Sequence, residues 1–171
     1  MKTEDIQFKL EEIKFHLELL YAIEESGKSL TLINNPEKEA SYLVSAVLNA
    51  FYSLTEMCGG KGNQYVKEFR EIYPSIYAGS GKGGLRNTTV HVAHKRIDFS
   101  GYISPQNGRV NFHFKETPKL APLEKSVGKV TLRFSPNFYL KINGEMVAIV
   151  DYFHEHLGAL KKLVSRLGVQ C

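Results

Sequence analysis

Residues 35–58, NPEKEASYLVSAVLNAFYSLTEMC, decide the fold of this chain because they predict one long buried helix. Asn35 is suited to cap the N-terminus of the helix, Pro36 suits its first position, and two glutamates follow in the positive first turn. Apolar residues then recur at helical spacing, at Ala40, Leu43, Val44, Val47, Leu48, Phe51 and Leu54. Cys58, the last residue of this segment, is followed by two glycines, which predicts that the helix ends there.

Two further helices are predicted on either side of this segment. Residues 3–26 carry a second apolar stripe of helical period, at Ile6, Leu10, Ile13, Leu17 and Leu20, widened by Phe8, Phe15, Leu19 and Ile23. The Ser-Gly pair after this stripe predicts the end of the first helix. Residues 64–73 predict a short third helix, capped by Asn63 and stopped by Pro74.

The pattern changes from helical to alternating after Asp98. Residues 109–115 (RVNFHFK) and 129–134 (KVTLRF) alternate polar and apolar side chains between turn residues, which predicts a small antiparallel sheet. The pair Asn143-Gly144 is also a hairpin signal. We interpret it as the start of a last helix, because helical spacing continues from there to Gly168.

The predicted fold class is therefore mainly α. We expect a bundle of four to five helices with a small antiparallel β insertion, at about residues 98–142, before the C-terminal helix. No repeat and no long linker divides the sequence, so residues 1–171 are expected to form one domain.

The composition excludes several classes of protein. Hydrophobic residues make up 43% of the chain and charged residues 23%, and no apolar run reaches the roughly 18 residues of a membrane span. The N-terminal segment lacks the apolar core of a signal peptide, and the two cysteines form no C-x-x-C pair. We therefore expect a cytoplasmic protein that contacts no membrane and needs no metal or cofactor. The net charge of +4 permits an anionic partner without demanding one.

Two glycine-containing stretches match loose phosphate-loop patterns. Residues 22–29, AIEESGKS, lie at the end of a predicted helix and place Glu24 and Glu25 where a phosphate would bind, so we interpret them as a helix end. Residues 79–84, GSGKGG, lack the hydroxyl residue that would hold magnesium. We interpret them as a flexible loop from which Lys82 can approach a nucleic-acid backbone.

Two groups of histidines raise the question of metal binding. His154 and His156 lie two residues apart in the last helix, do not share a helical face, and are interpreted as solvated surface. If their segment is helical, His91 and His94 share a face and, together with Asp98, could ligate a metal. No fourth ligand is evident, and a zinc or manganese enzyme is kept as an alternative.

Residues 86–91, RNTTVH, contain the groups needed to cleave a phosphodiester without a metal. A histidine can take or give a proton near neutral pH, and an arginine binds phosphate through a planar fork of donors. On a helix Arg86 and His91 lie about 140° apart, yet the long arginine can reach the same cleft edge. On a strand they would lie on opposite faces, and propensity leaves both structures open over residues 85–96. The alternative interpretation is a capped helix start with an incidental histidine.

In this helical setting, Arg86, Asn87 and His91 resemble the motif of the HEPN superfamily (higher eukaryotes and prokaryotes nucleotide-binding). Its members are compact helical bundles, and many are ribonucleases that need no metal. Their motif is an arginine, a polar residue and then a histidine after four to six intervening positions; four residues stand between Arg86 and His91 here. In several members an acidic or polar residue on the preceding helix supports this pair, which points to Glu56, or to Ser53 one turn earlier.

The resemblance implies that the 2′-hydroxyl of RNA attacks the adjacent phosphorus and leaves a cyclic phosphate and a free 5′-hydroxyl. His91 would act as general base or acid, Arg86 would stabilise the phosphorane oxygens, and Asn87 would orient the phosphate or the histidine. Family members commonly dimerise so that two motifs face one cleft. We therefore expect a homodimer, whose second histidine completes the acid and base pair.

The resemblance also implies a biological role, that of a toxin or anti-phage defence effector restrained by a cognate antitoxin or inhibitor protein. No acidic residue lies between Lys82 and Arg96 in the sequence, and we expect Lys82, Lys95 and Arg96 to contact RNA. Two departures matter. The β insertion is not part of the minimal bundle, and Ala93 stands where some toxins carry a modified tyrosine. The alternative function is a non-catalytic RNA- or protein-binding module of HEPN-like fold.

Overall fold

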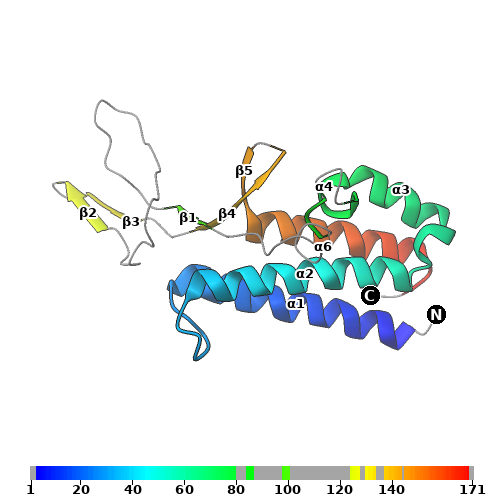
Figure 1. Ribbon diagram of the computed structural model, residues 1–171, viewed down its shortest axis with the longest axis horizontal. Helices are drawn as coiled ribbons and strands as arrows, with labels where there is room; N and C mark the ends of the chain where they lie inside the picture. The colour runs from blue at the N-terminus through cyan, green and yellow to red at the C-terminus, as the bar shows by residue number, and fades with distance from the viewer. Residues whose placement is uncertain are drawn as a thin grey trace.

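The computed structural model describes residues 3–79, 84–86, 98–100, 124–127, 130–133, 137–143 and 145–169. Its helices are α1 (Thr3–Ser26), α2 (Pro36–Met57), the short 3₁₀ helix η1 (Gly60–Gly62), α3 (Gln64–Ile72), α4 (Pro74–Tyr77) and α6 (Ile149–Arg166). Its strands are β1 (Asp98–Ser100), β2 (Glu124–Val127), β3 (Val130–Arg133), β4 (Asn137–Ile142) and β5 (Glu145–Ala148). The described chain is therefore mainly helical, with antiparallel strands before the C-terminal helix, as predicted (Figure 1).

The helix ends lie close to where the sequence predicts them. The side chain of Asn35 accepts a hydrogen bond from the backbone N–H of Lys38 at 2.9 Å, and Pro36 occupies the first position of α2. Asn63 caps α3 in the same way, accepting from two backbone N–H groups of its first turn. Pro74 follows the end of α3 without ending helical structure. A proline fits the first position of a helix, and α4 begins there.

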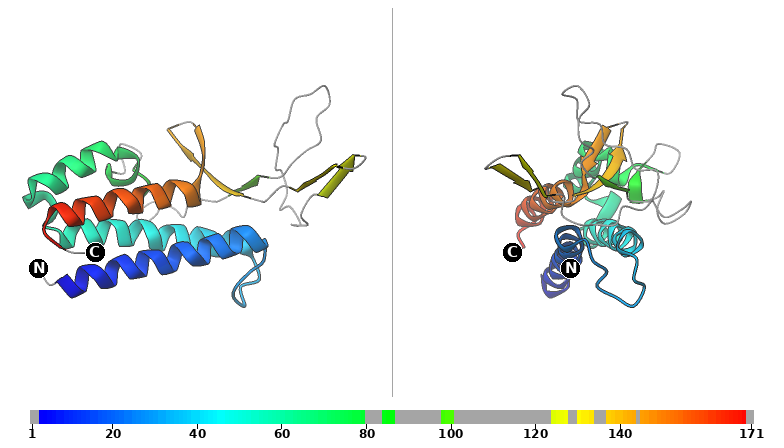
Figure 2. Two further views of the ribbon diagram at one scale, coloured as in Figure 1. Left: turned by 180° about the vertical axis from the view of Figure 1, so that it is seen from behind. Right: turned by 90° about the vertical axis from the view of Figure 1, so that its left-hand side faces the viewer.

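Three long helices surround the core. α1 packs along α2, and α6 lies against both of them (Figures 1 and 2). The ring of Phe51 on α2 meets Phe153 on α6 edge to face, with centroids 5.5 Å apart. The largest fully buried side chains of these helices and of β4 are Ile6, Ile13, Leu17, Leu20, Ile23, Leu48, Leu54, Phe51, Phe138 and Phe153. The main predicted stripes are thereby confirmed, but Phe8 and Phe15 are 69% and 57% exposed and do not widen the buried face of α1.

The described strands form two antiparallel sheets. β4 is the central strand of a three-stranded sheet with β1 and β5, whereas β2 and β3 pair as a separate hairpin. β4 contributes Phe138, Leu140 and Ile142 to the core, at the two-residue spacing of one strand face. The strand predicted at residues 129–134 is confirmed by β3, while the one at 109–115 lies outside the described residues.

The interpretation of Asn143-Gly144 as the start of the last helix is wrong. Asn143 has a φ of 52° and lies in the turn between β4 and β5, whose residues Ile142 and Glu145 pair across it. A left-handed asparagine favours the tight turns whose twist matches that of two antiparallel strands. The helical spacing therefore begins later than predicted, and α6 starts at Ile149.

A buried carboxylate connects α1 to the sheet. Glu24 is 8% exposed and accepts a hydrogen bond from the backbone N–H of Phe138 at 2.6 Å. Burial raises the pKa of Glu24 to about 7, an effect that the hydrogen bond from Phe138 opposes and the charge of Asp151 reinforces. The free energy of unfolding should therefore depend on pH in the neutral range.

We expect Glu24→Gln to abolish this part of the pH dependence. The pKa of Glu24 is higher in the folded chain than in the unfolded chain, where it is near 4.5, so the folded state binds more protons between these values. Glu24 should thus contribute a fall of roughly 2 kcal/mol in the free energy of unfolding as pH rises from about 4.5 to 7. Urea unfolding at pH 5 and pH 8 measures this contribution as the change in the difference between the wild type and Glu24→Gln, because the other titratable groups contribute equally to both. The variant should lack it, whereas Glu18→Gln, at an exposed position of the same helix, should retain it. Parallel profiles for the wild type and Glu24→Gln would contradict the assignment.

Candidate functional site

Arg86 lies against α2 at the end of a tightly packed segment. Leu85 and Arg86 have helical backbone, and Leu85 is buried in the core. A side chain at Gly84 would overlap the backbone carbonyl of Ala78, so glycine is required for this approach. The Arg86 guanidinium carbon lies 4.1 Å from the centre of the Tyr52 ring, within the range of a cation–π contact. The packing of Gly84 and Leu85 therefore fixes the place of the predicted catalytic arginine.

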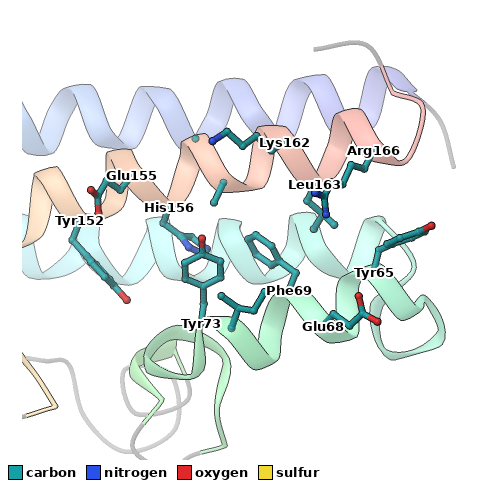
Figure 3. A pocket seen from close by; sticks show the side chains of 13 residues that line it. Tyr65, Glu68, Phe69, Tyr73, Tyr152, Glu155, His156, Lys162, Leu163 and Arg166 are labelled. Carbon is teal, nitrogen blue, oxygen red and sulfur yellow. The ribbon is translucent and has the colours of Figure 1, made fainter.

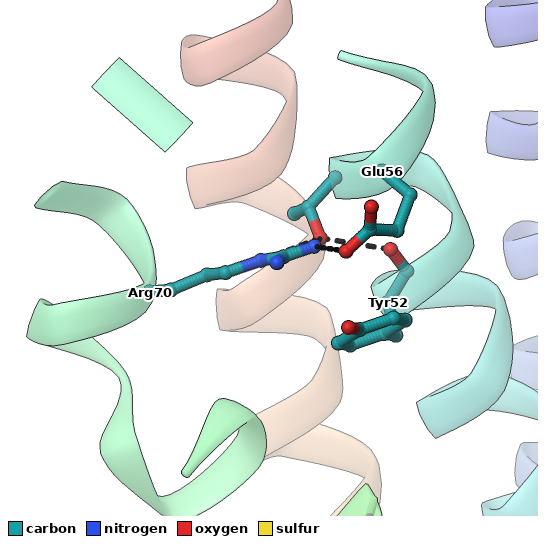
Figure 4. Close-up of polar contacts among 4 residues, drawn as sticks. Tyr52, Glu56 and Arg70 are labelled. Carbon is teal, nitrogen blue, oxygen red and sulfur yellow. Dashed lines mark hydrogen bonds and ion pairs between the residues drawn. The ribbon is translucent and has the colours of Figure 1, made fainter. Parts of the chain in front are cut away.

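Glu56, the predicted supporting acid, lies one turn after Tyr52 on α2. Its Oε1 accepts a hydrogen bond from Nη2 of Arg70 on α3 at 2.8 Å, shown in Figure 4. That hydrogen bond is the main reason why the pKa of Glu56 lies below its usual value. Gly60, in the turn after α2, has a φ of 50°, a backbone conformation that favours glycine, and a Cβ there would also meet the second carboxylate oxygen of Glu56 at 2.6 Å. Glu56 is therefore ionised at neutral pH and is a poor general base.

Arg70 connects the groups of this site, although it was not among the predicted site residues. Its Nε donates to Oγ1 of Thr55 at 3.0 Å, and its guanidinium carbon lies 4.5 Å from the centre of the Tyr52 ring. Residues 52, 55 and 56 share one face of α2 because they are three and four positions apart. The available signal was the position of Arg70 beside Phe69, in the buried stripe of an amphipathic helix where a charge needs partners.

The structure thus brings together two predicted site residues, Arg86 and Glu56, and adds Tyr52 and Arg70 to them. The other predicted site residues lie outside the described residues: Lys82, Asn87, His91, Lys95 and Arg96. The same holds for His94 of the alternative metal site, while Asp98 begins β1. Among the described residues, no group of three or more histidine, cysteine, aspartate or glutamate side chains is arranged to hold a metal.

The interpretation of His156 as a solvated residue is wrong. It is 2% exposed, and its Nε2 lies 2.9 Å from the hydroxyl of Tyr77. The rings of Phe51 and Tyr73 each lie 4.7 Å from it, measured between centroids. Burial lowers the pKa of His156 to about 3, so the ring is neutral. His156 is three residues after Phe153, in the buried stripe of α6, and this spacing was the signal in the sequence.

The Gly-Lys-Ser pattern of residues 22–29 leads into a loop that binds the chain's own carboxylate. Glu39 accepts hydrogen bonds from the backbone N–H groups of Leu30 and Thr31, at 2.8 and 3.1 Å, and from the hydroxyls of Ser29 and Thr31. Burial raises the pKa of Glu39, but these hydrogen bonds outweigh burial and lower it. The donors of this loop are therefore already engaged, which agrees with its interpretation as a helix end rather than a nucleotide site.

Searches against protein-family models, curated proteins and solved structures return no match for this chain. In the part of the chain that the structure describes, no helix combines the length and apolar character needed to cross a membrane. The function is therefore inferred from the geometry of the site and from the resemblance of its motif.

Proposed function

We propose that this protein is a metal-independent endoribonuclease of HEPN type that acts in the cytoplasm as a toxin or anti-phage defence effector. The observation that carries the proposal is the position of Arg86, whose guanidinium lies on the ring of Tyr52, one helical turn before Glu56. An arginine held in this way is oriented before the substrate arrives. Preorganised charge of this kind is commonly the largest contribution to the rate of phosphodiester cleavage.

In the proposed reaction, the 2′-oxygen of RNA bonds to the adjacent phosphorus and the bond to the 5′-oxygen breaks. His91 takes the proton of the 2′-hydroxyl, and a second histidine, from the other subunit of a homodimer, returns a proton to the leaving 5′-oxygen. Arg86 stabilises the charge on the phosphorane oxygens, and Asn87 orients the phosphate. The products are a 2′,3′-cyclic phosphate and a free 5′-hydroxyl.

Glu56 is a positioning residue in this mechanism. Its pKa is lowered by the hydrogen bond from Arg70, so it stays ionised and holds that arginine against Tyr52, on which Arg86 also lies. Lys82, Lys95 and Arg96 would contact the RNA backbone outside this centre. A cognate antitoxin or inhibitor protein would restrain the activity.

The test is cleavage of matched RNA and DNA strands by the purified protein in the presence of EDTA. RNA alone should be cut, because only RNA carries the 2′-hydroxyl nucleophile. The fragments should end in a cyclic phosphate, and His91→Ala should remove the activity. Intact RNA under these conditions, activity that requires a divalent metal, or equal cleavage of DNA would refute the proposal.

A non-catalytic binding module is the second candidate, favoured by apolar side chains on the surface. Leu32 is fully exposed in the loop between α1 and α2, and its neighbours Leu30 and Ile33 are about half exposed. Exposed apolar residues that lie close together are typical of protein-binding surfaces. This candidate predicts that RNA or a protein partner is retained intact, and that RNA affinity falls with rising salt.

A further inference from the structure

A groove of about 440 Å³ runs between α3 and α6. Its walls, shown in Figure 3, include Tyr65 and Phe69 of α3, Tyr73 at the end of that helix, and Tyr152 of α6. The volume falls in the range of about 300–1,000 Å³ that is usual for small-molecule sites. We call this feature the α3–α6 groove.

The aromatic side chains of the α3–α6 groove suit the stacking of a flat ring. Tyr65 is 55% exposed, and the Tyr152 hydroxyl lies 2.6 Å from Oγ of Ser75, a hydrogen bond that fixes the orientation of its ring. Aromatic side chains on both walls of a groove are typical of sites that bind unpaired bases, because every base has a stacking face.

Two cations lie along the α6 wall of the groove. Lys162 and Arg166 are four residues apart, so they share one face of the helix, and neither makes a salt bridge with a described residue. The carboxylate of Glu68, on the opposite wall, accepts a hydrogen bond from Gln64 of its own helix at 2.8 Å. Figure 3 shows Glu155 beside Tyr152, toward the other end from Arg166. This end of the groove therefore has two cations against the one carboxylate of Glu68, and the remaining positive charge favours a phosphate.

His156, a residue that lines the groove, contains a polar atom that has no partner among the described residues. Nδ1 of His156 is buried, and it makes no hydrogen bond with any described residue, although Nε2 is bonded to Tyr77. A buried polar atom without a partner costs free energy, and buried groups of this kind are uncommon. In the structure this atom has no exposed surface, so a base edge or a water molecule can supply the missing hydrogen bond only after a neighbouring side chain of the groove moves aside.

Gly158, in the middle of α6, lines the groove without placing a side chain in it. Glycine is unfavourable inside a helix, yet a Cβ at this position would meet no atom within 4 Å. Packing within the described chain thus gives no reason for a glycine here. The open space beside Gly158 is therefore available to a ligand in the groove.

From these observations we infer that the α3–α6 groove binds one nucleotide unit. The base stacks against Tyr73 and Tyr152, and the phosphate lies between Lys162 and Arg166. A free mononucleotide and an unpaired nucleotide of single-stranded RNA offer the same chemistry. Binding of single-stranded RNA rests on the proposed function, because the groove would then be a subsite for the RNA that is cut at Arg86.

Calorimetric titration of the full chain tests this inference with two probes, uridine 5′-monophosphate and a short 2′-O-methyl RNA strand. The methylated strand lacks the nucleophile, so binding is measured without cleavage. We expect saturable binding that becomes about tenfold weaker in Lys162→Ala/Arg166→Ala. The matched control Lys14→Ala/Lys28→Ala removes the same charge elsewhere on the surface and should bind as the wild type does.

Gly158→Leu supplies a second variant, which fills the groove without removing a charge. It should melt at or above the wild-type temperature, because leucine favours the helix, and it should abolish binding. Binding of the mononucleotide alone would identify a free nucleotide as the ligand, and binding of the strand alone would identify RNA. Binding of neither probe, or unchanged binding in both groove variants, would overturn the inference. RNA cleavage by the wild type is scored separately, so that failure of the groove and failure of the ribonuclease proposal are distinguished.

Discussion

Replacing Arg86 with alanine should slow RNA cleavage by about 10²–10³-fold, the loss typical of removing one preorganised donor from a charged transition state. Arg86 lies with its guanidinium on Tyr52, and in the proposed mechanism it stabilises the phosphorane oxygens. Arg86→Lys keeps the charge but loses the planar fork, and we expect an intermediate rate. Single-turnover cleavage of one labelled RNA strand measures both variants.

The control for this prediction is Lys67→Ala, which removes an exposed cation of α3. Its cleavage rate should stay within about twofold of the wild type, because exposed side chains outside a site contribute little to the transition state. Thermal melting should show that Arg86→Ala remains folded, since the lost cation–π contact contributes only about 1 kcal/mol. A folded Arg86→Ala protein that cleaves RNA at the wild-type rate would remove Arg86 from the mechanism.

His156 should make the fold sensitive to acid. Its pKa is about 3 in the folded chain and about 6.5 in the unfolded chain, so between these values the unfolded state binds more protons. The free energy of unfolding should therefore fall as pH is lowered from 6.5 toward 3, by about 4–5 kcal/mol in all. Glu24 acts in the opposite direction between pH 4.5 and 7, because its pKa is raised on folding. The loss caused by His156 should thus dominate below about pH 4.5.

The variant that isolates this effect is His156→Phe/Tyr77→Phe. It replaces both partners of the buried hydrogen bond with apolar rings, which is expected to be nearly neutral at pH 7. Other carboxylates titrate equally in the wild type and the variant, so the difference between their urea midpoints at pH 7, 5 and 4 reports on His156. A difference that stays constant over this range would show that His156 is not held neutral by burial.

Much of the fold follows from short-range signals in the sequence. Asn35 and Pro36 start α2, and apolar residues at helical spacing indicate which face of each long helix is buried. These signals act between residues a few positions apart, so they are readable without knowing the neighbours of a helix. The prediction of a helix start at Asn143 is wrong because the same dipeptide suits both a helix start and a hairpin turn. Pairing between β4 and β5 decides between them.

The sequence by itself therefore determined the helical class of the protein and most helix bounds, and it is the source of the prediction that the motif beginning at Arg86 is catalytic. Only the tertiary structure decided that Arg70 joins Glu56 to Tyr52, and that His156 is buried and neutral beside Tyr77. The physical reason is that a cap or a periodic stripe depends on nearby residues. The environment of a charged or titratable side chain depends on which distant helix packs against it.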